Sequence, residues 1–144
     1  MDDVSVLADA ASMIGMAPLT PREGVVHGWG DMEVAFAVER DGDGFLVRRE
    51  DRGRSSVMGR FPELTEADAF LLMILGSIWR TNRGLGDPFP AEPAPGAVVE
   101  RLDAGGYRVD AHGYSAVVAS RVYASRYAHV AGSGMQAVAE LLLA

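Results

Sequence analysis

The chain has 144 residues, no cysteine and a formal net charge of −7 at pH 7. That length fits one domain, residues 1–144, large enough to bury a core without disulfides or a metal. The lack of cysteine excludes disulfide frameworks, thiolate nucleophiles and zinc sites of the cysteine type. The start is acidic, and the longest apolar run, 69–75, is far shorter than the ~20 residues needed to cross a bilayer. We therefore expect a cytoplasmic protein that does not enter a membrane.

The acidity is concentrated in the first third of the chain. Residues 1–47 carry nine acids and two arginines, whereas residues 48–60 carry five arginines and two acids. So acidic a protein is a poor general binder of nucleic acid. The acidic third indicates either simple solubility or a face for a basic partner, because complementary fields speed association. The arginines indicate either solvated strand edges, paired with acids such as Glu33 and Glu39, or a recognition surface. They are Arg48, Arg49, Arg52, Arg54 and Arg60.

The first half of the chain predicts a helix and then a meander of strands. Asp2 or Asp3 can cap a helix whose apolar residues recur at three- and four-residue steps up to Ile14. Residues 21–30 are typical of a loop, with at most a short strand at 25–26. The expected strands are 33–39, 45–50 and 56–61. Their turns contain glycines, which supply the positive φ that tight hairpins need, and lie at 41–44 and 52–54.

Residues 65–84 predict one long helix. Thr65 is its expected N-cap, with Asp68 as the capping-box partner, and Gly84 ends it. The helix is apolar nearly all round, so we expect it to run through the middle of the domain. Trp79 is expected in the core, whereas Trp29 lies in a glycine-rich stretch and is left open.

The second half predicts more strands and a last helix. Four prolines within 86–96 bar helix and central strand and predict a stiff connector. The expected strands are 98–102, 107–111 and 114–123. Residues 124–130 are ambiguous. Ser133 and Gln136 form a second capping-box pattern that opens a final helix.

The two halves resemble each other. The run Val38-Glu39-Arg40 followed by Gly44-Phe45-Leu46-Val47 corresponds to Val99-Glu100-Arg101 followed by Gly106-Tyr107-Arg108-Val109. The offset is 61 and becomes 62 after one inserted residue. At the first offset, Ser56-Val57 with Arg60 matches Val117-Val118 with Arg121. We therefore predict an α+β fold: antiparallel sheet of about six strands, a central buried helix, N- and C-terminal helices, and a possible βββα pseudo-repeat.

No motif for catalysis or for metal or cofactor binding stands out. Asp41, Asp43 and Gly44 suggest a calcium loop, but its twelfth position is Arg52, where such a loop needs a bidentate glutamate. The three histidines are scattered, with no pair at metal-ligand spacing. Nucleophile-elbow and phosphate-loop patterns are missing. We therefore expect no catalytic residue, no metal and no cofactor.

One set of residues resembles a known family. The helix carries Asp68-Ala69-Phe70-Leu71, Leu75-Gly76, Arg80 and Gly84-Leu85, followed by Pro88 and Pro90. The strands carry Gly44-Phe45-Leu46-Val47 and Tyr107. This pattern, spread loosely over 40–125, resembles bacterial polymorphic-toxin immunity proteins. More narrowly, it resembles actinobacterial immunity proteins paired with NAD-glycohydrolase toxins of the tuberculosis necrotizing toxin type.

The resemblance implies an antitoxin that binds a cognate protein toxin and covers its NAD site, with no catalytic residue of its own. A 1:1 heterodimer is the expected complex, and a monomer is the expected free form. A cleft that grips NAD phosphates is usually electropositive, so an acidic surface suits it. The contact residues that we expect are those of the hairpin turns, namely Asp41, Asp43, Glu50 and Asp51, with Arg52 and Arg54 at the rim.

Two other classes of function stay open. An acidic, secretion-chaperone-like module that holds a protein client fits the same order of helices and strands, and would show an apolar groove and a stable homodimer. An enzyme or ligand-binding domain would show a deep polar pocket with acids of perturbed pKa.

Overall fold

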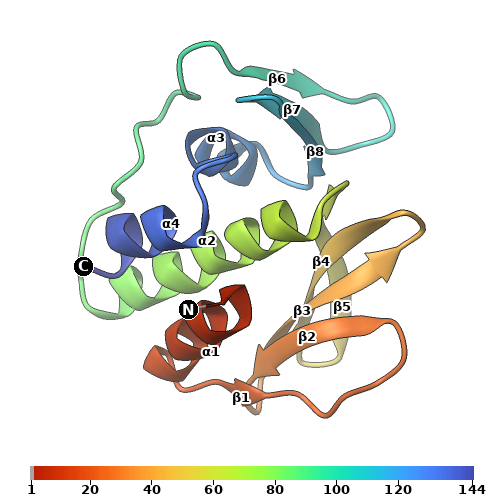
Figure 1. Cartoon of the computed structure of the whole chain (residues 1–144), viewed down its shortest axis with the longest axis vertical. Coiled ribbons are helices and arrows are strands. Elements are labelled where there is room, and N and C mark those ends of the chain that lie inside the picture. The colour runs from red at the N-terminus through yellow and green to blue at the C-terminus, as the bar shows by residue number, and fades with distance from the viewer. Residues whose placement is uncertain (1) are drawn as a thin grey trace.

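The computed structural model describes residues 2–144, and it shows an antiparallel sheet that curves around four helices (Figure 1). The α+β class is confirmed, but the sheet has eight strands and not about six. The helices are α1 (Asp3–Met13), α2 (Leu64–Asn82), α3 (Arg121–Val130) and α4 (Met135–Leu142). The strands are β1 (Ala17–Pro18), β2 (Val25–Gly30), β3 (Val34–Asp41), β4 (Gly44–Asp51), β5 (Arg54–Phe61), β6 (Val98–Arg101), β7 (Tyr107–Ala111) and β8 (Tyr114–Val118). None of the helices between residues 2 and 144 is both long and apolar enough to cross a membrane.

The two strands that the sequence did not predict in full, β1 and β2, form one end of the sheet. The stretch expected as a loop, 21–30, contains the whole of β2, which pairs with β3. Its glycines are required by close packing: a Cβ on Gly28 would lie 2.8 Å from the carbonyl oxygen of Phe36. Glycines that suggested a loop therefore mark a close approach of two strands.

The helix α2 runs through the centre of the fold, as expected. Every residue from Glu66 to Gly76 is buried. Its N-cap is Glu63, whose side chain makes no capping hydrogen bond, so the expected Thr65 cap is wrong. Trp79 is only partly buried, with Arg83 stacked 5.1 Å from its ring centre, whereas Trp29 is in the core. The expected core position of Trp79 is therefore wrong.

The sequence missed the helix α3. The expected strand 114–123 ends at Val118, and Ser120 caps α3 by accepting a hydrogen bond from the Tyr123 amide over 3.1 Å. The final helix α4 exists, but its N-cap is Gly134, without a side-chain bond, so the expected Ser133 capping box is wrong. The proline-rich connector, 86–96, contains no regular element.

The strand order shows that the pseudo-repeat is present in the fold. The sheet runs β1-β2-β3-β4-β5-β8-β7-β6, so β3-β4-β5-α2 (the first unit) and β6-β7-β8-α3 (the second unit) meet where β5 pairs with β8. The predicted offsets of 61 and 62 reproduce the hairpin register. Val38 pairs with Val47 as Val99 pairs with Val109, and Arg40 pairs with Phe45 as Arg101 pairs with Tyr107.

The third strand follows a different offset from the predicted one. Val47 pairs with Gly59 and Val109 pairs with Ala116, so Gly59 corresponds to Ala116, an offset of 57. The same offset relates the N-caps Glu63 and Ser120, and the first helical residues Leu64 and Arg121. The predicted match of Arg60 with Arg121 is therefore wrong, because the second hairpin is five residues shorter: Val47 and Gly59 are 12 positions apart in the chain, whereas Val109 and Ala116 are 7 apart.

Buried polar and aromatic contacts join the two units. The Tyr127 hydroxyl donates to Glu66 over 2.7 Å, and the Gly132 amide donates to the same oxygen over 3.0 Å. Burial and the hydrogen bond to Glu66 raise the pKa of Tyr127 above its usual value. Phe61 and Phe70 make edge-to-face contacts with the Tyr127 ring at centroid distances of 5.4 and 6.2 Å. Glu66 thus satisfies two donors inside the core, as a buried carboxylate must.

Candidate binding surfaces

The six residues predicted to contact a toxin lie in two groups. Asp41 and Asp43 belong to the β3–β4 turn, whereas Glu50, Asp51, Arg52 and Arg54 surround the β4–β5 turn. These turns are at opposite ends of the eight-residue strand β4. At about 3.3 Å per residue the two groups are roughly 23 Å apart, so the fold does not bring them into one patch.

Most of the acids in these groups are paired with arginines. Asp41 pairs with Arg60 over 2.7 Å and Asp51 with Arg49 over 3.1 Å. Glu50 lies 3.5 Å from Arg22. The predicted pairing of the arginine-rich strands with Glu33 and Glu39 is confirmed: Arg52 contacts Glu33 at 3.7 Å, and Arg48 contacts Glu39 at 2.9 Å. These arginines therefore offset much of the negative charge of the acids with which they pair.

A hollow of about 480 Å³ lies where the two units meet in the sheet, and we call it the seam hollow. Only two residue pairs join β5 and β8 there, Gly59 with Val118 and Arg60 with Val117. The apolar lining of the seam hollow comes from both units and consists of Phe45, Phe61, Pro62, Leu102, Ala116 and Val117. Asp41, Arg60 and Arg108 also line it, so it touches one of the two groups of predicted contact residues.

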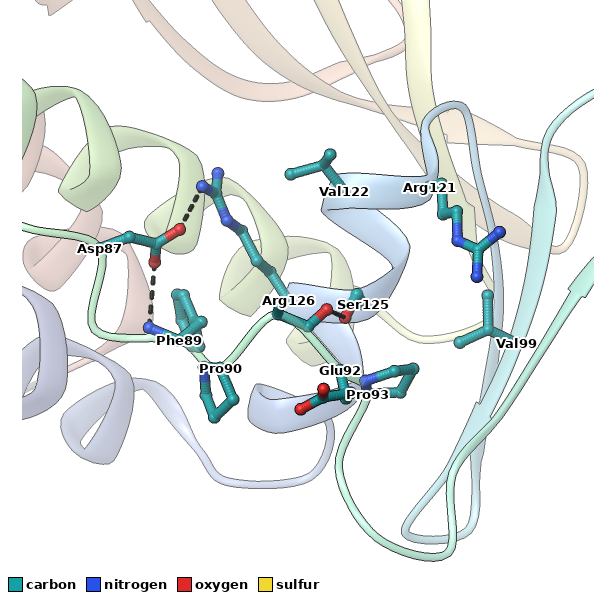
Figure 2. Close-up of a pocket in the computed structure, with 11 residues that line it drawn as sticks. Asp87, Phe89, Pro90, Glu92, Pro93, Val99, Arg121, Val122, Ser125 and Arg126 are labelled. Carbon is teal, nitrogen blue, oxygen red and sulfur yellow. Dashed lines mark hydrogen bonds and ion pairs between the residues drawn. The ribbon is translucent and has the colours of Figure 1, made fainter.

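A second cavity, of about 550 Å³, lies between α3 and the proline-rich loop, and we call it the α3 cleft (Figure 2). Its walls are Asp87 and residues 89–93 of the loop, Val99 of β6, and Arg121, Val122, Ser125 and Arg126 of α3. Val122 is 58% exposed. Both cavities have volumes in the range of small-ligand pockets.

The proline-rich loop is fastened to α3 and is not a free linker. Arg126 pairs with Asp87, and the Ser125 hydroxyl donates to the Ala91 carbonyl over 3.1 Å (Figure 2). The His129 ring contacts the Glu92 carbonyl over 2.7 Å. At the other end of the cleft Arg121 extends toward Val99, and within residues 2–144 it has no ion pair (Figure 2).

A buried, hydrogen-bonded histidine–aspartate pair lies on the opposite side of α2. His27 of β2 is 2.7 Å from Asp68 of α2, and their side chains are 10% and 3% exposed. Trp29 stacks on His27 at 5.3 Å. Burial, followed by the negative charges of Asp68 and Asp2, raises the pKa of Asp3 nearby. This group ties β2 to α2. No three metal-ligating side chains come together in the part of the chain that the structure describes.

Sequence reasoning did not find either cavity. Arg121 was predicted to lie in the strand 114–123, so no sequence pattern indicated that it borders the α3 cleft. The seam hollow depends on the pairing of β5 with β8, which are separated in the chain by a helix, the proline-rich loop and two strands. The one sequence signal close to it is the β3–β4 turn, whose Asp41 lines it.

The fold is similar to that of a solved structure, Rv3902c from M. tuberculosis. The TM-score is 0.73, and the match covers 96% of this chain and 87% of that one at 18% sequence identity. At such an identity the two proteins share a fold, which by itself says nothing about activity. No protein-family profile matches the sequence, and no curated protein matches it either.

Proposed function

We propose that this chain is an immunity protein that binds a cognate protein toxin, an NAD-degrading domain, and covers its active site. It acts in the cytoplasm as one half of a 1:1 complex and is a monomer when free. The proposal includes the expectation that the chain is not an enzyme and carries no cofactor.

The observation that carries the proposal is the residue pattern, and the fold comparison is compatible with it without indicating a function. The residue pattern of α2 and the strands resembles actinobacterial immunity proteins. The backbone fold, over 96% of the chain, is similar to that of a protein from M. tuberculosis, which is an actinobacterium. The proposal therefore rests on the residue pattern, because a shared fold is compatible with many functions.

The charge of the chain supports the proposal in a limited way. The net charge of −7 favours association with a basic surface. Since the β4–β5 turn acids are held in ion pairs, the acids available to a partner are the unpaired, exposed ones, such as Asp9 and Asp43.

The direct test is capture of the partner from the native operon, followed by an enzymatic assay. The tagged chain is co-expressed with its neighbouring genes, the captured protein is identified, and NAD hydrolysis by that protein is measured with and without this chain. We expect stoichiometric inhibition that saturates at one chain per toxin. NAD hydrolysis that continues at the same rate in the presence of excess chain contradicts the proposal.

The predicted contact surface has its own test. Alanine at Asp41 and Asp43 changes one turn, and alanine at Glu50 and Asp51 changes the other, so the two double variants separate the two ends of β4. If both double variants and the combined quadruple variant bind the toxin as the wild type does, none of these acids is part of the contact surface.

The α3 cleft favours a second candidate, a module that holds an extended client. The cleft opens beside β6, the last strand in the sheet order, whose outer edge has no strand partner among residues 2–144. An added strand from a client could pair with that edge while its side chains enter the cleft. A stable homodimer in sedimentation, together with binding of unfolded clients but of no toxin, would favour this candidate.

A further inference from the structure

The turn between β2 and β3 carries the most exposed large apolar side chain of the described residues. Met32 is 103% exposed, whereas the six other exposed side chains of this kind between residues 2 and 144 range from 43% to 58%. Those six lie on helices, on the edge strand β6 or in the loop after α2. The β3–β4, β4–β5 and β7–β8 turns have glycine and a polar residue at their tips instead. Met32 therefore adds nothing to the core and is free to contact a partner.

The backbone on both sides of Met32 is fixed by hydrogen bonds. One carboxylate oxygen of Asp31 accepts from the amides of Glu33 and Val34, each over 2.8 Å. The bonds from Val34 and Glu33 lower the pKa of Asp31, which keeps this acceptor charged at neutral pH. The Arg52 amide donates to the Glu33 carbonyl over 2.9 Å and so joins the β2–β3 turn to the β4–β5 turn. Met32 therefore projects from a preorganised turn, and little backbone freedom is lost when a partner binds it.

The charges around Met32 balance, so they select neither a basic nor an acidic partner. Glu33 contacts Arg52 at 3.7 Å, and Asp51 contacts Arg49 at 3.1 Å. The charged residues of the two joined turns, 31–33 and 51–54, are three acids and three arginines once the ion-pair partner Arg49 is included: Asp31, Glu33, Asp51, Arg49, Arg52 and Arg54. What distinguishes this end of the sheet is therefore the apolar side chain at its tip.

A single side chain on a projecting turn is buried only by a concave partner. A cleft that binds NAD is concave, and it holds the flat nicotinamide and adenine rings in slots lined mainly by apolar and aromatic side chains. Methionine suits such a slot, because its flexible, polarisable thioether fills irregular gaps and makes favourable contacts with aromatic rings. We infer that Met32 enters a ring-binding slot of the toxin's NAD cleft and anchors the complex there.

This inference rests on the proposed function and names the element that would perform it. It also separates the two groups of predicted contact residues. The group around the β4–β5 turn flanks Met32, because Arg52 is bonded to Glu33, whereas Asp41 and Asp43 lie at the other end of β4. An apolar anchor in a desolvated pocket supplies much of the affinity of a protein complex, so Met32 should dominate binding.

Three substitutions of Met32 test the anchor against the toxin domain encoded beside this chain. Met32→Ala removes the side chain, and Met32→Gln makes it polar at about the same length. We expect each to raise the Kd about 30-fold, mainly through faster dissociation. Met32→Leu keeps an apolar side chain of similar volume and should bind within about 3-fold of the wild type. Nicotinamide and ADP-ribose, the products of NAD hydrolysis, should together compete with the wild-type chain for the toxin.

Val122→Ala is the matched control. Val122 is the next most exposed large apolar residue of the described chain, at 58%, and it lies on α3 in the second unit. Its truncation should leave toxin binding within about 3-fold of the wild type. Because Met32 is fully exposed, its variants should unfold at the wild-type temperature, and thermal unfolding checks this.

The outcomes separate the inference from the proposed function. If the toxin is bound and inhibited but Met32→Ala and Met32→Gln bind it like the wild type, the anchor is elsewhere and the proposed function stands. If Met32→Ala weakens binding but the two products do not compete, Met32 lies outside the NAD cleft and the inference is wrong. If the toxin is neither bound nor inhibited, both are wrong. If sedimentation shows that the free chain dimerises and that Met32→Ala makes it monomeric, the turn is an interface between copies and the inference is wrong.

Discussion

The first unit uses strands of eight residues and a helix of 19, whereas the second uses strands of four or five residues and a helix of 10. The two units correspond in their hairpin registers and in the positions of their helix N-caps. They also share a pair of residues with positive φ in the turn before the third strand, Arg52-Gly53 in the first unit and His112-Gly113 in the second. The two units differ in how many residues of their helix are buried. Only α2 is buried over 11 consecutive residues, because strands and three helices pack around it. The shared plan therefore sets the topology, and the longer helix supplies the core.

The largest expected effect comes from breaking the polar link between the units. Glu66→Ala leaves the Tyr127 hydroxyl and the Gly132 amide without their acceptor. We expect a loss of about 3 kcal/mol in the free energy of unfolding, since unsatisfied buried donors cost roughly 1–3 kcal/mol each. Urea unfolding measures it. Glu66→Gln keeps the accepting oxygen and should stay within about 1 kcal/mol of the wild type; equal losses in the two variants would show that the bonds contribute nothing.

The next effect tests the part of α2 that has no counterpart in α3. A Cβ on Gly76 would lie 2.8 Å from the Cβ of Leu142 in α4. Gly76→Ala improves helix propensity by about 1 kcal/mol, but overpacking costs typically 1–3 kcal/mol. We expect a net loss of up to about 2 kcal/mol, measured by thermal unfolding. Ser77→Ala, at the next position, adds no volume and serves as the control. A stabilised Gly76→Ala would mean that α4 moves away at little cost.

A smaller effect compares equivalent positions, since Phe70 and Tyr127 are related by the offset of 57 between the units. Tyr127→Phe removes one of the two bonds to Glu66, and we expect a loss of about 1–2 kcal/mol. Phe70→Tyr adds a hydroxyl at a fully buried position and should also destabilise. The denaturant concentration at the unfolding midpoint of each variant measures these losses of stability. If Tyr127→Phe is as stable as the wild type, the hydroxyl is not part of the link.

Tyr127 also predicts a dependence on alkaline pH. Its pKa is raised in the folded state, so the folded chain keeps the phenol proton at pH values at which the unfolded chain loses it. The contribution is whole below pH 10, the ordinary tyrosine value, and is lost as the pH rises above it. We expect stability to fall less steeply above pH 10 in Tyr127→Phe than in the wild type. Tyr123→Phe, which keeps Tyr127, should follow the wild-type curve.

The smallest effect compares the two N-caps. Ser120 caps α3 through its hydroxyl, whereas Glu63 makes no side-chain bond at the equivalent position of α2. Ser120→Ala should cost about 1 kcal/mol, and Glu63→Ser should gain up to about that amount by supplying the missing acceptor. Thermal unfolding measures both. Identical stability of the wild type and Ser120→Ala would show that the cap bond is not significant.

The parts of the fold that sequence predicted are those in which a local pattern decides the structure. The alternation of 33–39 and the glycine turns specify the hairpins, and the apolar run of α2 specifies burial. The parts that failed depend on distant partners. Gly28 and Gly30 suit a loop until Phe36 and Ala35 come close to them in β3. The β-branched and aromatic residues before α3 favour a strand until Ser120 caps a helix there.

The candidate sites were less predictable than the fold. Asp41 and Asp43 were chosen because they lie in an acidic hairpin, and the structure places Asp41 at the seam hollow. Glu50, Asp51, Arg52 and Arg54 were chosen for the same reason but lie at the far end of β4. A charge pattern gives the sign of a surface, whereas the strand pairing that makes a cavity is a long-range property. The toxin-contact surface itself stays a prediction.

The narrow join between β5 and β8 has a mechanical consequence. The backbone joins the two halves of the sheet through two residue pairs of β5 and β8 and through a hydrogen bond from the Ala119 amide to the Met58 carbonyl over 2.8 Å. Because this join is short, much of the resistance to a force that pulls the halves apart comes from the helices behind the sheet. There the Glu66 carboxylate and the packed rings of Phe61, Phe70 and Tyr127 connect the first unit to the second. The angle between the two halves of the sheet therefore depends on the packing of the core more than on the hydrogen bonds between β5 and β8.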